Sequence, residues 1–189
     1  MRKVFIHIGL PKTGTSFLQT HLFHVWQGLD FVRNPTLDNL VSLERDRKVL
    51  ISKEGLSGRP WHSYESHRDW RWQQSQETYL DNLRDLYPDA KVLISFRKHA
   101  SYILSLYKQY LHLGGTAEFA EFFSAAGPDG ILKRDDLYFR HLIERVEARF
   151  AGRPFVFMQE EMRDDLDHLL REMGDFFGEA PPDISHVRH

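Results

Sequence analysis

Hydrophobic residues gather in short continuous runs at four places along the chain. The runs are Val4–Ile8, Val49–Ser52, Lys91–Phe96 and Pro154–Met158. A strand with one solvated face alternates polar and apolar residues, whereas a strand buried on both faces is apolar nearly throughout. The four runs therefore predict strands of a parallel sheet that is covered on both sides.

Between these runs, apolar residues recur at intervals of three and four, which is the spacing of an amphipathic helix. Helices are predicted over Ser16–Trp26, Ser75–Leu86, Ala100–Leu113, Thr116–Ala126, Asp135–Phe150 and Asp164–Phe177. Gly178 follows the last of them and suits a left-handed helix C-cap. This alternation predicts an α/β fold, with a doubly wound, mostly parallel sheet of four to five strands flanked by helices. The expected three-layer arrangement is similar to that of P-loop NTPases.

Two segments follow neither period. Residues 55–74 carry aromatic and histidine side chains among polar ones, namely Trp61, His62, Tyr64, Trp70 and Trp72. A loop of this length in a compact domain usually serves function, so we interpret 55–74 as an acceptor-side or lid segment. The alternative is that these rings cover the edge of the core. Residues 179–189 are predicted to be an irregular tail, and residues 1–189 are interpreted as one domain.

Composition narrows the class of protein. The chain has 189 residues, a net charge of −2 and no cysteine. A net charge near zero argues against a nucleic-acid partner. The lack of cysteine excludes disulfides, thiolate catalysis and cysteine-based zinc sites. No signal-peptide pattern precedes the first strand, and no apolar run has the length of a transmembrane helix. We therefore expect a cytoplasmic protein, while the oligomeric state cannot be inferred from the sequence.

The first candidate site is the turn between the first strand and the first helix, which has the sequence GLPKTGTS over Gly9–Ser16. Backbone N–H groups at a helix N-terminus point toward anions, and Gly14 allows an oxygen atom to approach the backbone. Further hydroxyl donors come from Thr13, Thr15 and Ser16. A Walker A loop places its lysine directly after the second glycine, whereas Lys12 precedes Gly14. The turn predicts a phosphate site without the usual magnesium and β/γ-phosphate arrangement.

The second candidate site begins at Arg97, which follows the strand predicted over Lys91–Phe96. Ligands of open α/β sheets bind at the carboxyl ends of the strands, and an arginine side chain offers phosphate a planar, permanently charged fork of donors. Ser101, Ser105 and Lys108 follow at helical spacing on one face of the next helix. These residues predict a second phosphate site, with a structural ion pair of Arg97 as the alternative.

Together the two sites resemble the bacterial type of the sulfotransferases that use 3′-phosphoadenosine 5′-phosphosulfate (PAPS). The resemblance rests on the Pro-Lys-Thr-Gly-Thr-Ser loop and on an arginine followed eight residues later by a serine. It also rests on VFMQEEMRDDLDHLLREMGDFFG, which is similar to the family's late strand, acidic turn and helix ending in Phe-x-Gly. It implies that the 5′-phosphosulfate is bound by Lys12, Thr13, Gly14, Thr15 and Ser16. The 3′-phosphate would be bound by Arg97 and Ser105, with Ser101 as an accessory.

The same resemblance implies a catalytic role for Lys12. Transfer of the sulfuryl group breaks the bond between sulfur and the oxygen that bridges to the 5′-phosphate, so negative charge develops on that oxygen. A lysine beside it stabilises the leaving group, the desulfated product 3′-phosphoadenosine 5′-phosphate (PAP). A sulfuryl group carries less charge than a γ-phosphoryl group, and no metal is expected.

The acceptor needs a general base, and Glu54 is the first candidate because it follows the strand predicted over Val49–Ser52. His62 and His7 are alternative bases, although His7 lies within a predicted buried strand, which is more typical of a packed core histidine. Lys53 is a candidate partner of the sulfuryl oxygens. The expected acceptor is a small molecule, a carbohydrate or a lipid, with a hydroxyl or an amine group.

Two other functions are open at this stage. A small-molecule kinase of P-loop architecture predicts a lysine after Gly14, which the sequence lacks. A non-catalytic nucleotide-binding protein of the same fold predicts that Glu54 and Lys12 have no role in turnover.

In the sulfotransferases a late loop often closes over the adenine and the 3′-phosphate. Residues 179–189 are short for such a loop, with Arg188 as the candidate remnant.

Overall fold

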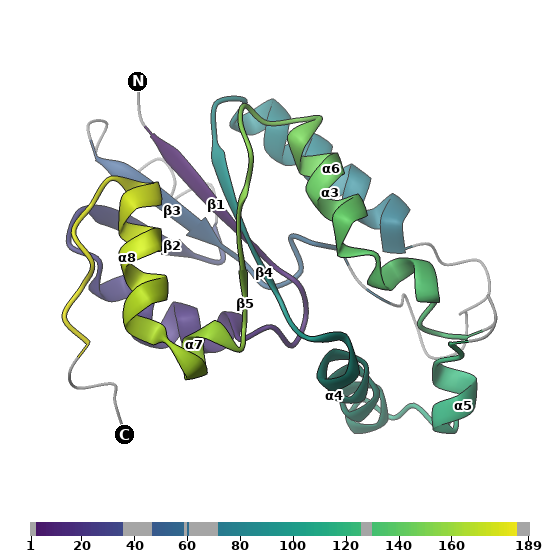
Figure 1. The fold of residues 1–189 in the computed structure, drawn as a ribbon. Helices are drawn as coiled ribbons and strands as arrows, with labels where there is room; N and C mark the ends of the chain where they lie inside the picture. The colour runs from purple at the N-terminus through teal and green to yellow at the C-terminus, as the bar shows by residue number, and fades with distance from the viewer. Residues whose placement is uncertain (1–2, 36–46, 59, 61–71, 126–129, 185–189) are drawn as a thin grey trace.

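The computed structural model describes residues 3–35, 47–58, 60, 72–125 and 130–184. Its centre is one parallel sheet of five strands in the order β2-β3-β1-β4-β5 (Figure 1). The strands are β1 Val4–Gly9, β2 Leu29–Arg33, β3 Lys48–Ser52, β4 Lys91–Phe96 and β5 Phe155–Met158. Parallel pairing sets Ile6 of β1 beside Ile51 of β3 and Val92 of β4. The predicted doubly wound α/β fold is confirmed.

Strand β2 was not predicted from the hydrophobic pattern. Its sequence LDFVR contains Asp30 and Arg33. Among the described strands only β3 pairs with it, because β2 lies at the edge of the sheet. Asp30 forms an ion pair with Arg47, with 2.8 Å between Oδ1 and Nε. An edge strand tolerates such charges, and they interrupt the apolar run that would have revealed it.

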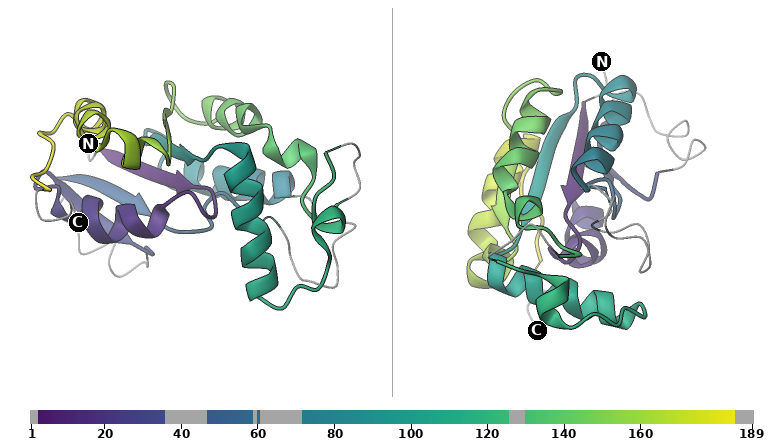
Figure 2. Two further views of the ribbon diagram at one scale, coloured as in Figure 1. Left: turned by 60° about the horizontal axis from the view of Figure 1, so that its bottom comes forward. Right: turned by 90° about the vertical axis from the view of Figure 1, so that its right-hand side faces the viewer.

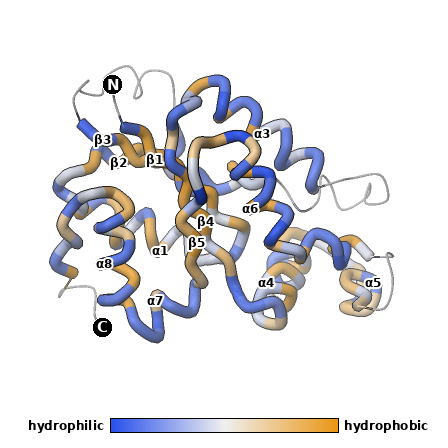
Figure 3. Tube along the Cα trace, turned by 45° about the horizontal axis from the view of Figure 1, so that its top comes forward, coloured by the Kyte–Doolittle hydropathy of each residue, from blue (hydrophilic) through white to orange (hydrophobic). Residues whose placement is uncertain are grey.

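Helices cover both faces of the sheet (Figures 1 and 2). The long ones are α3 Trp72–Leu86, α4 His99–His112, α6 Phe139–Glu147 and α8 Leu166–Phe177. Ile6 and Ile8 of β1 pack into a core with residues of α3, α4 and α6. Phe5 of β1 packs into a second core with α8 and with the residues that follow the loop after β1. Hydrophobic residues therefore concentrate on the strands, and the outer helices alternate in hydropathy (Figure 3).

The helix predicted over Ser16–Trp26 is not a continuous α-helix. It begins as α1, Thr15–Phe17, continues as a π-helical turn η1, Leu18–Leu22, and ends as a 3-10 turn η2, Phe23–Val25. Leu18, Leu22 and Phe23 are fully buried against the sheet. A widened π-helical turn shifts the direction of the following side chains and is common at functional sites. The hydrophobic spacing could not distinguish these forms of helix.

Other helices differ from their predicted bounds. The structure has α5 over Phe119–Phe122, η3 over Arg134–Leu137 and α7 over Glu161–Asp164. The helix predicted over Thr116–Ala126 is therefore a single turn, because Phe123 is extended and bridges to Leu132. Helix α3 begins at Trp72, inside the segment predicted to be irregular. Gly178 adopts the predicted left-handed C-cap of α8, with φ of 66°.

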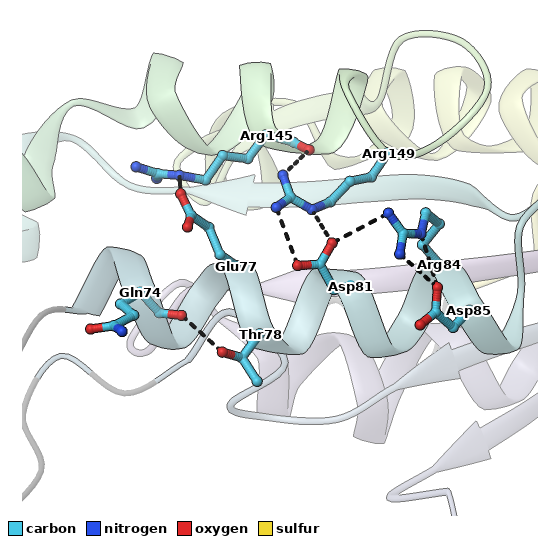
Figure 4. Close-up of polar contacts among 8 residues, drawn as sticks. All are labelled: Gln74, Glu77, Thr78, Asp81, Arg84, Asp85, Arg145 and Arg149. Atoms are coloured by element: carbon cyan, nitrogen blue, oxygen red, sulfur yellow. Dashed lines mark hydrogen bonds and ion pairs between the residues drawn. The ribbon is translucent and has the colours of Figure 1, made fainter.

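Helices α3 and α6 lie side by side and are joined by ion pairs (Figure 4). Arg149 Nε lies 2.9 Å from Asp81 Oδ1, and Arg145 Nε lies 3.3 Å from Glu77 Oε1. The hydrogen bond from Arg149 holds the pKa of Asp81 below its ordinary value. These pairs fix the two helices side by side on one face of the sheet.

At the amino end of the sheet, Lys48 of β3 joins the last helix. Its Nζ donates to the carbonyl oxygens of Phe177, at 2.9 Å, and Gly178, at 2.7 Å. It also lies 2.7 Å from Glu179 Oε1. Residues 179–184 are irregular as predicted, and Ile184 is buried in the second core. None of the described helices is long and apolar enough to cross a membrane.

Candidate functional site

The two predicted phosphate features lie at the same edge of the sheet. The loop over Leu10–Gly14 follows β1, and Arg97 follows β4, which pairs with β1. After β1 the chain runs to β2 on one side of the sheet, and after β4 it runs to β5 on the other side. The carboxyl ends of β1 and β4 therefore form the switch point at which open α/β sheets bind ligands.

The loop has a concave backbone. Lys12 and Gly14 both adopt left-handed conformations, with φ of 65° and 87°. A left-handed lysine costs about 1–2 kcal/mol, so other contacts must hold it. Gly14 also packs closely, because a Cβ atom there would lie 2.4 Å from Met162 Cε. Left-handed residues at a helix start turn successive N–H groups toward one point, which is an anion-binding geometry.

The three hydroxyl-bearing residues of the loop have different positions. Thr13 is fully buried, and its Oγ1 donates to Leu10 O at 2.7 Å and contacts Ser95 Oγ at 2.8 Å. Its side chain therefore anchors the loop. Thr15 Oγ1 is buried and has no hydrogen-bond partner among the described residues. Ser16 is exposed at the first turn of α1.

Arg97 joins the two features. Its Nη1 donates to the carbonyl oxygen of Lys12 at 3.2 Å, and its Nε donates to Ser101 Oγ at 3.0 Å. Further along α4, Gln109 Oε1 accepts a hydrogen bond from Lys12 Nζ at 3.4 Å. Ser105 lies midway between Ser101 and Gln109 at intervals of four, so it shares their face of α4. This face of α4 therefore borders the loop along its length.

Two residues of this arrangement were not predicted. Gln109 continues the spacing of Ser101 and Ser105, and this interval could have indicated it in place of Lys108, which is exposed. Glu160 follows β5 and accepts from the Lys98 backbone N–H, at 3.2 Å, and from Ser101 Oγ, at 3.3 Å. Its carboxylate thus lies at the N-terminus of α4, where the helix dipole favours an anion.

Below the loop lies a buried polar residue of β1. His7 has no exposed surface, and its ring nitrogens lie 2.9 Å from Ser52 Oγ and 3.2 Å from Ser95 Oγ. Burial lowers the pKa of His7 from its ordinary value of 6.5 to about 3, so the imidazole is neutral. His7 is therefore the packed core histidine that its strand position favoured, and its ring does not reach solvent.

The candidate base Glu54 follows β3 and is exposed, as is Lys53. No ion pair joins Glu54 to another residue in the described part of the chain. The turn that carries Glu54 is fixed by Ser57, whose Oγ donates to Gly9 O at 3.1 Å. Glu54 therefore lies beyond the carboxyl end of β3, the strand beside β1, and at the same edge of the sheet as the loop.

The aromatic residues of 55–74 divide into two groups. Trp72 is buried in the core, and its Nε1 donates to Ser57 O at 2.7 Å. Trp72 therefore covers the core and does not line an acceptor pocket. The remaining candidates lie outside the described residues, namely Trp61, His62, Tyr64 and Trp70, and so does Arg188.

A pocket opens beside the first residue of the loop, between α3 and α6. Its lining combines polar and aromatic side chains: Leu10, Gln73, Gln76, Asp135, Asp136, Tyr138, Phe139, His141, Leu142 and Arg145. Neither Lys12 nor Arg97 lines it. Over the described ranges, no group of three or more histidine, aspartate or glutamate side chains is arranged to hold a metal ion.

This arrangement of strands and helices is the fold of the sulfotransferases. A sulfotransferase from Alicyclobacillus acidocaldarius is similar with a TM-score of 0.64 and 19% identity, covering 98% of this chain and 85% of that one. The mouse sulfotransferase SULT7A1, complexed with PAP, is similar with a TM-score of 0.56 and 15% identity. That match covers 99% of this chain and 61% of the mouse chain. The sequence itself matches no protein-family profile and no curated protein.

Proposed function

We propose that this protein is a PAPS-dependent sulfotransferase that transfers a sulfuryl group to a hydroxyl or amine of its acceptor. The observation that carries the proposal is the hydrogen bond from Arg97 Nη1 to Lys12 O, 3.2 Å long. This bond unites two anion-binding features, the loop after β1 and the start of α4, in one site. PAPS has two phosphate-bearing ends that such a site would suit.

The residues present fit this donor. Thr15 offers a buried hydroxyl that has no partner in the described part of the chain, and the left-handed Gly14 would turn N–H groups of α1 toward an anion. Together with Lys12, Ser16 and the Thr13 N–H, they would bind the 5′-phosphosulfate. Arg97 and Ser105 would bind the 3′-phosphate, with Ser101 holding the guanidinium in place. The PAP in the mouse structure supports this assignment by analogy of fold.

In the proposed reaction the acceptor oxygen or nitrogen attacks sulfur, and the bond from sulfur to the bridging oxygen of the donor breaks. The electron pair of that bond remains on PAP, where Lys12 stabilises it electrostatically. The acceptor loses its proton to a base, for which Glu54 is the proposed residue. The proposed acceptor is a small molecule, a carbohydrate or a lipid.

The test is thermal stabilisation by PAP, compared with ADP and with ATP plus magnesium at equal concentrations. A ligand that binds the native state raises the unfolding temperature by mass action. We expect PAP to stabilise without magnesium, and we expect Arg97→Ala to weaken PAP binding about 30-fold because charge-assisted hydrogen bonds to phosphate are lost. The matched control is Arg140→Ala, an exposed arginine on α6.

The outcomes separate the candidate functions. Stabilisation by magnesium-ATP alone would overturn the proposal in favour of a kinase. If PAP binds but PAPS is not consumed with any of a panel of alcohols, phenols, sugars and amines, the protein is a nucleotide-binding protein without turnover. Loss of turnover in Lys12→Ala and Glu54→Gln, with PAP affinity changed mainly by the former, would support the assigned roles.

A further inference from the structure

Five buried polar residues connect three strands to the phosphate loop, and we call them the strand-end network: Gln19, Ser52, His7, Ser95 and Thr13. Gln19 Nε2 lies 2.9 Å from Ser52 Oγ, which lies 2.9 Å from His7 Nδ1. On the other side, His7 Nε2 lies 3.2 Å from Ser95 Oγ, which lies 2.8 Å from Thr13 Oγ1. All five are at most 6% exposed.

The direction of every hydrogen bond in the strand-end network follows from its two ends. Thr13 gives its one hydroxyl proton to Leu10 O, so it accepts from Ser95. Ser95 has then used its proton, so it accepts from His7, and His7 carries its proton on Nε2. His7 Nδ1 is therefore an acceptor, and Ser52 donates to it. Ser52 Oγ in turn accepts from the Gln19 amide, which can only donate through Nε2.

A single state of His7 satisfies this chain. The imidazole must carry its proton on Nε2, because an unprotonated Nε2 would need the one Ser95 proton, which the contact with Thr13 Oγ1 already requires. Burial disfavours a second proton on Nδ1. The network therefore has one proton order and one geometry.

The end of the network lies at the strained part of the loop. Thr13 stands between Lys12 and Gly14, the two left-handed residues that give the loop its concave backbone. Its side chain is bound on both sides, to Leu10 O and to Ser95 Oγ. The conformation of the loop at Thr13 therefore depends on Ser95, and through Ser95 on the proton that His7 holds.

We propose that His7 is a positioning residue for the phosphate loop, acting through Ser95 and Thr13 without contact with the ligand. The part of this proposal that concerns PAP rests on the proposed function, whereas the part that concerns loop geometry does not. A merely structural histidine would affect stability and leave the loop and its affinity unchanged at temperatures well below unfolding.

The variants are His7→Phe, which removes both ring nitrogens, His7→Gln, whose amide retains one donor and one acceptor, and Ser95→Ala. The matched control is Leu80→Ala, which removes buried volume from α3, outside the strand-end network. Two quantities are measured at a temperature at which all variants are folded: amide hydrogen exchange of residues 12–16 and the Kd of PAP. A third measurement, the ¹⁵N shifts of the His7 ring in the wild type, reports its protonated nitrogen.

We expect exchange of residues 12–16 to become at least tenfold faster in His7→Phe and Ser95→Ala and to be largely restored in His7→Gln, with no change in Leu80→Ala. The Kd of PAP should rise about tenfold in the same two variants. Unchanged exchange in His7→Phe, or a His7 ring protonated on Nδ1, would overturn the inference whether or not PAP binds. If the wild type binds no PAP, the proposed function falls, and the exchange data alone decide the role of His7.

Discussion

At the residue scale, His7 gives the protein a measurable pH dependence of stability. Its neighbours are the hydroxyls of Ser52 and Ser95 and the rings of Phe23 and Phe157. Burial is the cause of its lowered pKa. In the unfolded chain His7 takes up a proton as the pH falls below 6.5, whereas in the folded chain it stays neutral down to about 3.

As the pH is lowered from 6 to 4, the free energy of unfolding should therefore decrease by about 1.4 kcal/mol per pH unit on account of His7 alone. Above pH 6.5 this contribution is constant. Urea unfolding of the wild type and of His7→Gln, measured at several pH values, isolates it, because glutamine does not titrate and the remaining groups are common to both. Parallel pH profiles of the two proteins would contradict the assignment.

Single residues also show how far the sequence could be interpreted. The positions of Lys12, Gly14 and Arg97 were predictable because each follows a strand whose carboxyl end is fixed by topology. The contacts of Gln19, Gln109 and Glu160 were not, because each depends on the distance between two elements that the sequence does not report. Thr13 was predicted to bind phosphate by its hydroxyl, but in the structure that hydroxyl donates to Leu10 O and contacts Ser95 Oγ.

At the scale of elements, the N-terminus of α4 bears an anion of the protein itself. Glu160 accepts from the Lys98 N–H and from Ser101, which also contacts Arg97. A 3′-phosphate bound to Arg97 would be repelled by this carboxylate. Glu160→Gln removes the charge and retains an acceptor for the Lys98 N–H.

We expect Glu160→Gln to lower the Kd of PAP about threefold at low salt, with a smaller effect at high salt because the repulsion is screened. Titration of PAP by calorimetry at two salt concentrations tests this. Glu144→Gln, an exposed change on α6, is the control. Weaker binding in Glu160→Gln would instead indicate that the carboxylate is needed to order the start of α4.

Elements also differ in how well their patterns predicted them. The four apolar runs were all strands, because burial on both faces leaves few alternatives. The charged edge strand β2 and the change from α-helix to π-helix after Phe17 were not predictable from spacing. Strand β2 depends on pairing with a single neighbouring strand. The π-helical turn depends on how Leu18, Leu22 and Phe23 pack against the sheet.

At the scale of the whole molecule, the two ends of the sheet have different tasks. The carboxyl end carries the loop, Arg97 and Glu54. The amino end carries contacts that hold the last helix, chiefly those of Lys48 with Phe177, Gly178 and Glu179. A positive charge that donates to the last carbonyls of a helix stabilises its C-terminus.

Lys48→Met should therefore reduce the free energy of unfolding by about 1–2 kcal/mol and leave the Kd of PAP unchanged. Denaturant unfolding and PAP titration on the same protein sample measure the two effects. If PAP affinity falls together with stability, the two ends of the sheet are coupled, and this division of tasks is wrong.

The central position of β1 has a consequence for synthesis. β1 is made first, yet its partners in the strand-end network come much later: Ser52 is 45 residues beyond His7 and Ser95 is 88. Since ribosomes add about 5–20 residues per second, Ser95 is added several seconds after His7. Until β4 is made, at least one edge of this apolar strand is unpaired, which leaves it open to aggregation. Chaperone engagement of the nascent chain should therefore be strongest before β4 emerges, and the phosphate loop acquires its shape only afterwards.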